Sequence, residues 1–254
     1  MELFILGSGT GVISLKRGSP GFLLKTSQNL FLIDSGPGTL TRILKAGFEL
    51  NDIDAIFYTH IHPDHVTDLV PFLFASKYGD QKRRKKLALI GGPGFKKFFH
   101  ELSRTYRGWL IPKSYTLKIR EVAQGSFNFQ KVFIRTAKTN HISESVAFRF
   151  EENNSSVVFS GDTDLSESLV ELAKEATLFL LECSFPDTMK IKGHLIPKEV
   201  ARLANLSKPK KLVLCHFYPP CDRTDILESV KRFYRGKVVL GRDGMKVNIS
   251  DIKR

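Results

Sequence analysis

Residues 59–65 read Thr-His-Ile-His-Pro-Asp-His and directly follow the apolar run Ala55–Tyr58. Four of these seven residues carry imidazole or carboxylate groups, the ligands that borderline cations such as zinc prefer. In an extended chain the side chains of His60 and His62 point to the same side and can share one metal. The proline then turns the chain, so that Asp64 and the next histidine can face a second metal. Because two metals ~3.5–4 Å apart clamp the attacking and leaving oxygens of a phosphoryl or acyl substrate, this stretch predicts a two-metal hydrolytic site.

Short apolar runs, each followed by turn residues, recur on both sides of this stretch. They predict strands at Leu3–Leu6, Gly21–Thr26, Leu30–Ile33, Ala55–Tyr58, Leu87–Ile90, Val132–Thr136, Val146–Phe150, Val157–Ser160, Leu178–Leu181 and Leu212–Cys215. Helical spacing predicts helices at Thr39–Ala46, Pro93–Tyr106, Ser166–Ala173, Pro197–Asn205 and Thr224–Phe233. This alternation favours a layered α/β sandwich. Because no linker rich in Pro, Gly or Ser divides the chain, we expect a single domain over residues 1–254.

Length and composition narrow the class of protein. The chain has 254 residues, of which 42% are hydrophobic, enough to bury a substantial core. No apolar run approaches the ~20 residues that a bilayer crossing needs, so we expect no membrane association. The first residues lack the basic start of a secretory signal. Three cysteines cannot form a closed disulfide framework, which favours a reducing, cytoplasmic location.

Basic residues are concentrated in one part of the chain. The formal net charge is +13, and thirteen bases against two acids between Lys77 and Arg120 supply most of it. Such a cluster attracts polyanions, and aromatic residues in the same segment, such as Trp109, can stack on bases. The alternative is an ordinary solvated surface. The candidate nucleic-acid-binding residues are the five consecutive bases Lys82, Arg83, Arg84, Lys85 and Lys86.

Two aspartates and two histidines occupy similar places in the two halves of the chain. Asp34 and Asp162 each end an apolar strand within a turn that contains glycine, and His60 and His216 each end a later strand. Two similar half-sandwiches facing each other would bring these strand ends to one edge. By contrast, His100 lies in a basic helical segment and is expected to be an ordinary surface residue.

In order and spacing, these motifs resemble the signature of the metallo-β-lactamase superfamily of binuclear hydrolases. The resemblance covers essentially the whole chain and implies a four-layer αββα sandwich. It implies two divalent metal ions, Zn²⁺ in the first place with Mn²⁺ or Fe²⁺ as alternatives. The implied ligands are His60, His62 and His141 for one metal, Asp64, His65 and His216 for the other, and Asp162 as the bridge, with Asp34 supporting the site.

Within the superfamily, the chain is most similar to ribonuclease Z, the endonuclease that trims the 3′ end of precursor tRNA. The opening Met-Glu-Leu-Phe-Ile-Leu-Gly-Ser-Gly-Thr-Gly and the segment Val-Val-Phe-Ser-Gly-Asp-Thr-Asp both match that family. The resemblance implies that Glu182 and His194 act as a proton-relay pair, and we expect Asp64 or Asp162 to orient the attacking water. The expected partner is RNA or another phosphodiester, and a homodimer is compatible with the sequence.

The chain also departs from ribonuclease Z. That family usually has glycine at the position of Pro63 and serine at the position of Leu195. It also inserts a tRNA-gripping arm where this chain has only twenty residues between His141 and Asp162. A small-substrate metallohydrolase on the same metals is therefore an alternative, such as a cyclic-nucleotide phosphodiesterase, a lactonase or a sulfatase-like enzyme. A non-catalytic nucleic-acid-binding module is a further alternative, although all seven ligand positions are filled.

Overall fold

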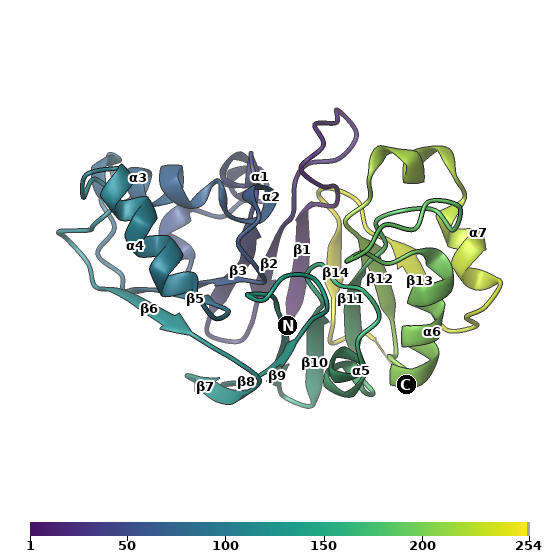
Figure 1. The fold of residues 1–254 in the computed structure, drawn as a ribbon. Helices are drawn as coiled ribbons and strands as arrows, with labels where there is room; N and C mark the ends of the chain where they lie inside the picture. Colours follow the sequence, from purple (N-terminus) through teal and green to yellow (C-terminus); the bar gives the residue numbers. More distant parts are fainter. Residues whose placement is uncertain (253–254) are drawn as a thin grey trace.

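The computed structural model describes residues 1–252, which form two seven-stranded mixed sheets packed face to face (Figure 1). The first sheet has the strand order β14-β1-β2-β3-β4-β5-β6, and its strands from β3 to β6 run parallel. Its strands are β1 (Glu2–Gly7), β2 (Gly21–Lys25), β3 (Leu30–Ser35), β4 (Ala55–Tyr58), β5 (Leu87–Gly91), β6 (Leu117–Glu121) and β14 (Lys246–Asn248).

The second sheet repeats this plan. Its order is β13-β12-β11-β10-β9-β8-β7, with antiparallel pairing from β7 to β10 and parallel pairing from β10 to β13. Its strands are β7 (Gly125–Phe129), β8 (Val132–Lys138), β9 (Val146–Glu152), β10 (Ser155–Phe159), β11 (Leu178–Glu182), β12 (Leu212–Cys215) and β13 (Val238–Leu240). The two halves therefore share the arrangement that the paired Asp and His strand ends indicate.

Helices cover the outer face of each sheet (Figure 1). The first sheet is covered by α1 (Thr39–Lys45), α2 (Pro63–Val66), α3 (Leu69–Tyr78), α4 (Phe95–Thr105) and the short 3₁₀ helix η1 (Leu50–Asp52). The second is covered by α5 (Glu167–Ala173), α6 (Pro197–Ser207) and α7 (Ile226–Lys231), with a 3₁₀ turn η2 (Pro219–Arg223) before α7. Among the described residues, none of the helices has both the length and the apolar character that crossing a bilayer requires.

Three apolar layers hold these elements together. The central layer lies between the sheets, where Phe57 of one sheet meets Phe150 of the other edge to face with 4.9 Å between ring centroids. The other two layers pack α1 to α4 against the first sheet and α5 to α7 against the second. Burying such side chains contributes roughly 25 cal/mol per Å² of apolar surface. The predicted four-layer αββα sandwich is confirmed.

Several elements differ from the sequence prediction. The helices α2 and α3 and the strands β6, β7, β13 and β14 are additional to the prediction, whereas all ten expected strands are present with ends shifted by at most two residues. The last helix begins at Ile226 rather than Thr224, because the Asp225 side chain accepts a hydrogen bond from the backbone N–H of Glu228 and caps the helix there.

Candidate metal centre

The predicted ligands come from four segments that follow strands and meet at one edge of the sandwich. His60 and His62 lie in the turn from β4 into α2, and Asp64 and His65 lie within α2. The other three side chains follow β8, β10 and β12, respectively: His141, Asp162 and His216. Carboxyl ends of parallel strands are the usual place for sites in open α/β sheets.

The ligand atoms of His60, His62, His141 and Asp162 form a first set, in which all lie within 4.8 Å of one another. Nδ1 of His62 lies 3.1 Å from Nε2 of His60 and 3.0 Å from Nε2 of His141. Two ligand nitrogens on one tetrahedral zinc ion, with Zn–N of about 2.0–2.1 Å, are ~3.3 Å apart. The spacing of this set therefore fits a single small cation.

A second set consists of Asp64, His65 and His216. The Nε2 atoms of His65 and His216 are 3.4 Å apart, and each is within 3.7 Å of Oδ2 of Asp64. Asp162 faces both sets, since its Oδ2 is 3.7 Å from Nε2 of His60 and its Oδ1 is 3.3 Å from Nε2 of His216. Oδ1 is buried and has no hydrogen-bond partner. An orphaned carboxylate oxygen between two imidazoles is the environment that a bridging metal ligand needs.

Asp34 orients the second set from behind. Its Oδ2 accepts a hydrogen bond from Nδ1 of His65 at 2.9 Å, and its two oxygens also accept from the backbone and hydroxyl of Thr59. This contact fixes the proton of His65 on Nδ1 and leaves the Nε2 lone pair for a metal. The same threonine oxygen accepts from Nδ1 of His60 at 3.1 Å, with the same effect on that ring. Asp34 lies where it can orient His65, and its supporting role stays a prediction.

The turn before Asp162 requires a glycine. Gly161 has φ of +58°, and a Cβ there would lie 2.6 Å from Cβ of Thr59. Gly193 has φ of +86°, and its carbonyl accepts a hydrogen bond from Nδ1 of His141 at 2.9 Å. Both glycines thus allow the backbone to approach the side chains that position the ligand atoms.

Glu182, at the end of β11, is buried and uses both carboxylate oxygens. Its Oε1 accepts from Nδ1 of His194 at 3.2 Å and from the backbone of Thr163, and its Oε2 accepts from the backbone of Leu195 and the hydroxyl of Ser184. The contact with Glu182 holds a proton on Nδ1 of His194, and Nε2 has no hydrogen-bond partner among the described residues. The geometry of the predicted pair is therefore that of a carboxylate–imidazole dyad.

Ser184 joins this dyad to the candidate metal ligands, and it is not among the residues that the sequence predicts for the site. Its hydroxyl donates to Glu182, so it accepts from Nδ1 of His216, which lies 2.9 Å away. Nε2 of His216 is then the atom left for the metal. Nothing in the sequence distinguishes this serine, because its role depends on the end of β11 lying between two histidines that are distant in sequence.

Burial and charge move the pKa values of these groups apart. Burial lowers the pKa of His60 well below its usual range, so that its ring is neutral and able to bind a metal. Burial by itself raises the pKa of Asp64, but the hydrogen bond and charge of His216 and His65 outweigh it and lower the pKa to about 2. Burial likewise opposes the charged form of His194, but the bond to Glu182 outweighs it and raises the pKa. Asp64 is thus an acceptor at neutral pH, and the bond to Glu182 favours the charged form of His194.

Arg83, one of the predicted nucleic-acid-binding residues, is buried in the fold. Its guanidinium donates to the backbone carbonyl oxygens of Leu50, Ile53, Lys85 and Lys86. Its side chain has no surface exposed to solvent, so the prediction that it contacts a polyanion is wrong. It ties the loop before β5 to η1.

The other four bases of the run lie at the surface, but they precede β5. Since β4 and β5 are parallel, with Ala55 opposite Ala88 and Tyr58 opposite Gly91, the run lies at the edge opposite to the metal centre. Lys85 also pairs with Asp54 at 2.9 Å. The run is therefore separate from the candidate metal site.

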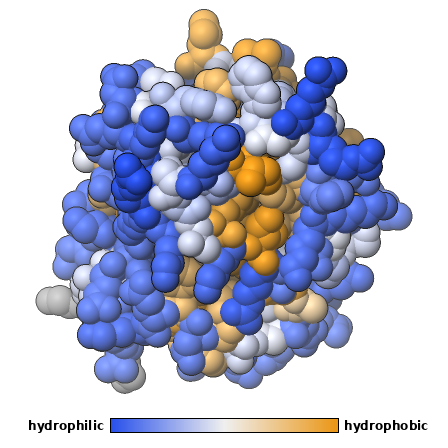
Figure 2. Space-filling model, turned by 90° about the vertical axis from the view of Figure 1, so that its left-hand side faces the viewer, coloured by the Kyte–Doolittle hydropathy of each residue, from blue (hydrophilic) through white to orange (hydrophobic). Residues whose placement is uncertain are grey.

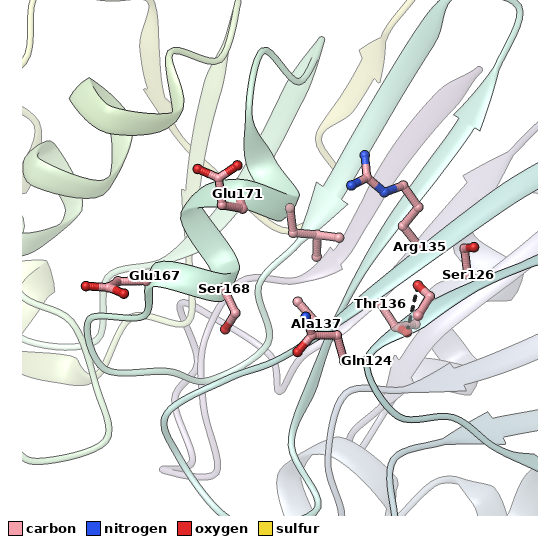
Figure 3. A pocket seen from close by; sticks show the side chains of 10 residues that line it. Gln124, Ser126, Arg135, Thr136, Ala137, Glu167, Ser168 and Glu171 are labelled. Carbon is pink, nitrogen blue, oxygen red and sulfur yellow. Dashed lines mark hydrogen bonds between the residues drawn. The ribbon is translucent and has the colours of Figure 1, made fainter.

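A separate pocket of about 430 Å³ lies between the hairpin β7–β8 and helix α5 (Figure 3). Arg135 extends from β8, and Glu167 and Glu171 extend from α5. Acidic and basic groups face it from opposite sides, and it contains none of the predicted ligands. It does not belong to the metal centre.

Two packed mixed sheets with these His and Asp clusters at one edge define a metallo-β-lactamase-fold metallohydrolase. The fold is similar to that of YhfI from Bacillus subtilis, a metallo-beta-lactamase fold protein, with a TM-score of 0.85 and 22% identity over 97% of this chain and 98% of that one. It is also similar to human tRNase Z, short form, with a TM-score of 0.80 and 22% identity over 98% and 99% of the two chains. In sequence, ribonuclease Z of Mycobacterium sp. (strain KMS) is 27% identical over 87% of this chain and 85% of the relative.

The family model described as "Anti-Pycsar protein Apyc1" matches residues 1–238, and the chain belongs to that family. The predicted resemblance to the metallo-β-lactamase superfamily and to ribonuclease Z is confirmed. The chain is a metal-dependent hydrolase similar to ribonuclease Z.

Proposed function

We propose that the chain is a two-metal phosphodiesterase that cleaves RNA or nucleotide phosphodiesters. The observation that carries this proposal is the combination of two ligand sets sharing Asp162 with a buried Glu182–His194 pair beside them. The first set of His60, His62 and His141 and the second of Asp64, His65 and His216 would each hold one divalent ion. Zinc is the first choice because the donors are imidazoles and carboxylates, and Mn²⁺ and Fe²⁺ accept the same donors.

The bound metals supply Lewis acidity, which activates water and neutralises charge on a phosphodiester. Asp64, ionised at neutral pH, accepts a hydrogen bond from the attacking water and orients it toward phosphorus. His194 donates the proton on its Nε2 to the departing alkoxide oxygen, a contribution of typically ~10²–10⁴ in rate. Glu182 acts through His194 by holding its ring and favouring the charged imidazolium.

Two substrate classes remain within this proposal. Relatives named ribonuclease Z support RNA, including the 3′ processing of tRNA. A small phosphodiester such as a cyclic nucleotide is the second candidate, because β9 and β10 form a short hairpin between His141 and Asp162. That hairpin leaves no room for a tRNA-gripping arm at this place.

The test is a substrate panel with zinc-reconstituted protein: precursor tRNA, short RNA, cyclic nucleotides, bis(p-nitrophenyl) phosphate, a lactone and a sulfate ester. We expect hydrolysis of phosphodiesters, loss of activity with chelator, and no turnover of the last two. Turnover restricted to the lactone or the sulfate ester would contradict the proposal. RNA binding without turnover or metal would instead support the non-catalytic binding module.

We also propose that the chain forms a homodimer through an aromatic patch. Phe74 and Tyr78 of α3 contact Trp109 in the segment after α4, and each of these side chains is 41–56% exposed. Figure 2, which views the side of the molecule with α3 and α4, shows apolar side chains gathered among hydrophilic ones. Interface cores are rich in aromatic residues. Light scattering should give a dimer that Trp109→Ser converts to a monomer, and a monomeric wild type would contradict this.

We place the protein in the cytoplasm. Cys183, Cys215 and Cys221 are all buried free thiols, which suits a reducing compartment. Localisation of a tagged full-length chain checks this assignment.

A further inference from the structure

An aromatic pair that is not among the predicted site residues lies beside Glu182 and His194. It consists of Phe185, which follows β11, and Tyr218, which follows β12, and the two rings stack with 4.4 Å between centroids and 17° between planes. Because β11 and β12 are parallel neighbours, with Glu182 opposite Cys215, both aromatic residues emerge at the edge that carries the metal centre. Strand direction therefore places this pair in the same way as it places the candidate ligands.

The backbone fixes the position of the aromatic pair. The N–H of Tyr218 donates to the carbonyl of Ser184 at 3.1 Å, and the N–H of Phe185 donates to the carbonyl of Leu195 at 3.4 Å. A proline restricts the residue before it to an extended conformation, and Tyr218, which precedes Pro219, has φ of −72° and ψ of 157°. Phe185 is buried and Tyr218 is partly buried. The two rings therefore form a fixed wall next to His194.

His194 lies in the loop between β11 and α6, so side-chain contacts must fix the orientation of its ring. The hydrogen bond from its Nδ1 to Glu182 restrains one ring atom and leaves the tilt of the ring plane open. The His216 ring stacks on this ring at 5.6 Å and 16°. Phe185 and Tyr218 meet it edge to face, with centroids 5.9 and 5.8 Å away, an arrangement that aromatic rings favour. The tilt of His194 is thus set between a candidate metal ligand and the aromatic pair.

We propose that Phe185 and Tyr218 are positioning residues for the proton donor, which keep the His194 ring at the tilt that directs Nε2 to the departing oxygen. This inference rests on the proposed phosphodiesterase function and adds the two residues on which its proton transfer depends. Both act through His194 and not on the substrate. Since a proton donor must lie within about 2.6–3.2 Å of the oxygen that it protonates, a change in ring tilt stops the transfer while the metals stay bound.

The first test is Phe185→Leu, because the Phe185 ring meets the rings of His194 and Tyr218 and those of none of the candidate ligands. On a phosphodiester with a poor alkoxide leaving group we expect kcat to fall ~10–100-fold, the scale of a misplaced catalytic group. KM and metal content should not change. On bis(p-nitrophenyl) phosphate, whose leaving group departs without a proton, kcat should stay close to wild type. A role in the fold alone would lower both rates equally, so equal losses would overturn the proposal.

Variants of Tyr218 separate the ring from its hydroxyl. Tyr218→Phe keeps the ring and should match wild type, whereas Tyr218→Leu should lose kcat on the alkoxide substrate only. Because this ring also meets His216 at 5.8 Å, elemental analysis accompanies both variants. An equal loss in Tyr218→Phe, or loss of metal in Tyr218→Leu, would overturn the positioning role of Tyr218. The matched control is Phe233→Leu, an exposed aromatic residue after α7, which should match wild type on both substrates.

A measurement of ring order separates this inference from the proposed function. NMR of the zinc-loaded protein, labelled with ¹³C at Cε1 of histidine, reports the order of the His194 ring even if no phosphodiester is hydrolysed, and His194→Ala identifies its signal. We expect a sharp signal in wild type and Tyr218→Phe, and a line broadened by exchange in Phe185→Leu and Tyr218→Leu. Equal line widths in these proteins would overturn the positioning role whatever the turnover.

Discussion

The stretch 59–65 and the run 82–86 are both dense clusters of one chemistry in the sequence, yet they have opposite fates in the fold. The first follows β4 and faces a centre built from both sheets, whereas the second precedes the neighbouring parallel strand β5. They lie at opposite ends of adjacent strands, about 16 Å apart for a five-residue strand. Strand direction thus decides which clusters can act on the same substrate, and closeness in sequence does not.

The two clusters also differ in what their polar atoms contact. At the metal edge, nitrogens of four ligand histidines are held by Asp34, Thr59, Ser184 and the Gly193 carbonyl so that the opposite nitrogens converge and remain free. In the run, the N–H groups of Arg83 donate hydrogen bonds to backbone carbonyls. Imidazole nitrogens that converge without protein partners indicate a ligand site. Guanidinium N–H groups that all donate to backbone carbonyls indicate a structural role.

The largest expected effect is at Asp162. Asp162→Ala removes the only carboxylate shared by the two ligand sets, so after zinc reconstitution we expect fewer than one metal per chain, against two in wild type. Phosphodiesterase activity should fall by more than the ~10²–10⁴ of a lost general acid. Elemental analysis and turnover measure this, and His100→Ala, on the outer helix α4, should match wild type. Full metal content in Asp162→Ala would refute the shared bridge.

Next comes His194, which tests proton delivery apart from metal binding. His194→Ala should keep both metals and lose ~10²–10⁴ in turnover on a phosphodiester with a poor alkoxide leaving group. On a nitrophenyl phosphodiester, whose leaving group departs without a proton, the loss should be much smaller. Equal losses on both substrates would show that His194 holds substrate or structure. Loss of metal would make it a ligand.

Glu182 gives a smaller, pH-dependent effect. The bond to Glu182 raises the pKa of His194, and a general acid works only while it is protonated, so activity declines as the pH rises through that pKa. Glu182→Gln removes the raising charge and should move the alkaline limb of the kcat/KM profile to lower pH. The pH–rate profile on the alkoxide substrate measures this shift. An unmoved limb would mean that another group sets it.

Much of the centre could be predicted because its chemistry lies at strand ends, where residue type alone is informative. The seven ligand positions, Asp34, and the pair Glu182 and His194 all come together as the sequence indicates. Ser184 could not be predicted, because a serine two residues after a glutamate is unremarkable until distant histidines pack on either side. The burial of Arg83 could not be predicted either, since a run of five bases ordinarily indicates a solvated surface.

The fold was predictable to a similar degree and for similar reasons. Long apolar strands can be recognised from the sequence. The strands β13 and β14 have only three residues each, too few to show the alternation of apolar and polar side chains that marks a strand. In β6, Leu-Lys-Ile-Arg-Glu, apolar and charged residues alternate as in a strand. Because three of its five residues are charged, this strand at the sheet edge is easily taken for a loop. The helix α3 is nearly all apolar at its start, so it shows no polar face from which a helical period could be recognised.

A substitution of Arg83 tests whether this buried residue of the run stabilises the fold. Arg83→Met removes donors from buried carbonyls, each of which costs ~1–3 kcal/mol when left unpaired. We expect a loss of roughly 2–4 kcal/mol in the free energy of unfolding and a Tm lower by about 5–15 °C. Arg84→Met, at the neighbouring exposed position, should shift the Tm by little. Thermal unfolding of both variants measures the two Tm values. If Arg83→Met were as stable as Arg84→Met, the Arg83 guanidinium would not be needed for the stability of the fold.

The smallest effect is expected from the exposed bases Lys82, Arg84 and Lys86, and it should depend on substrate length. Because the run and the metal centre lie at opposite edges, a dinucleotide held at the metals cannot reach these bases. Replacing all three with glutamine should therefore leave the salt slope for a dinucleotide unchanged. A folded RNA that spans both edges can still contact them, so its slope should fall by up to about 2, at ~0.7 per contact. Binding titrations at several salt concentrations measure both slopes. A reduced slope for the dinucleotide would place the run beside the metals and break the separation of the two clusters, whereas unchanged slopes for both substrates would make the run an ordinary solvated loop.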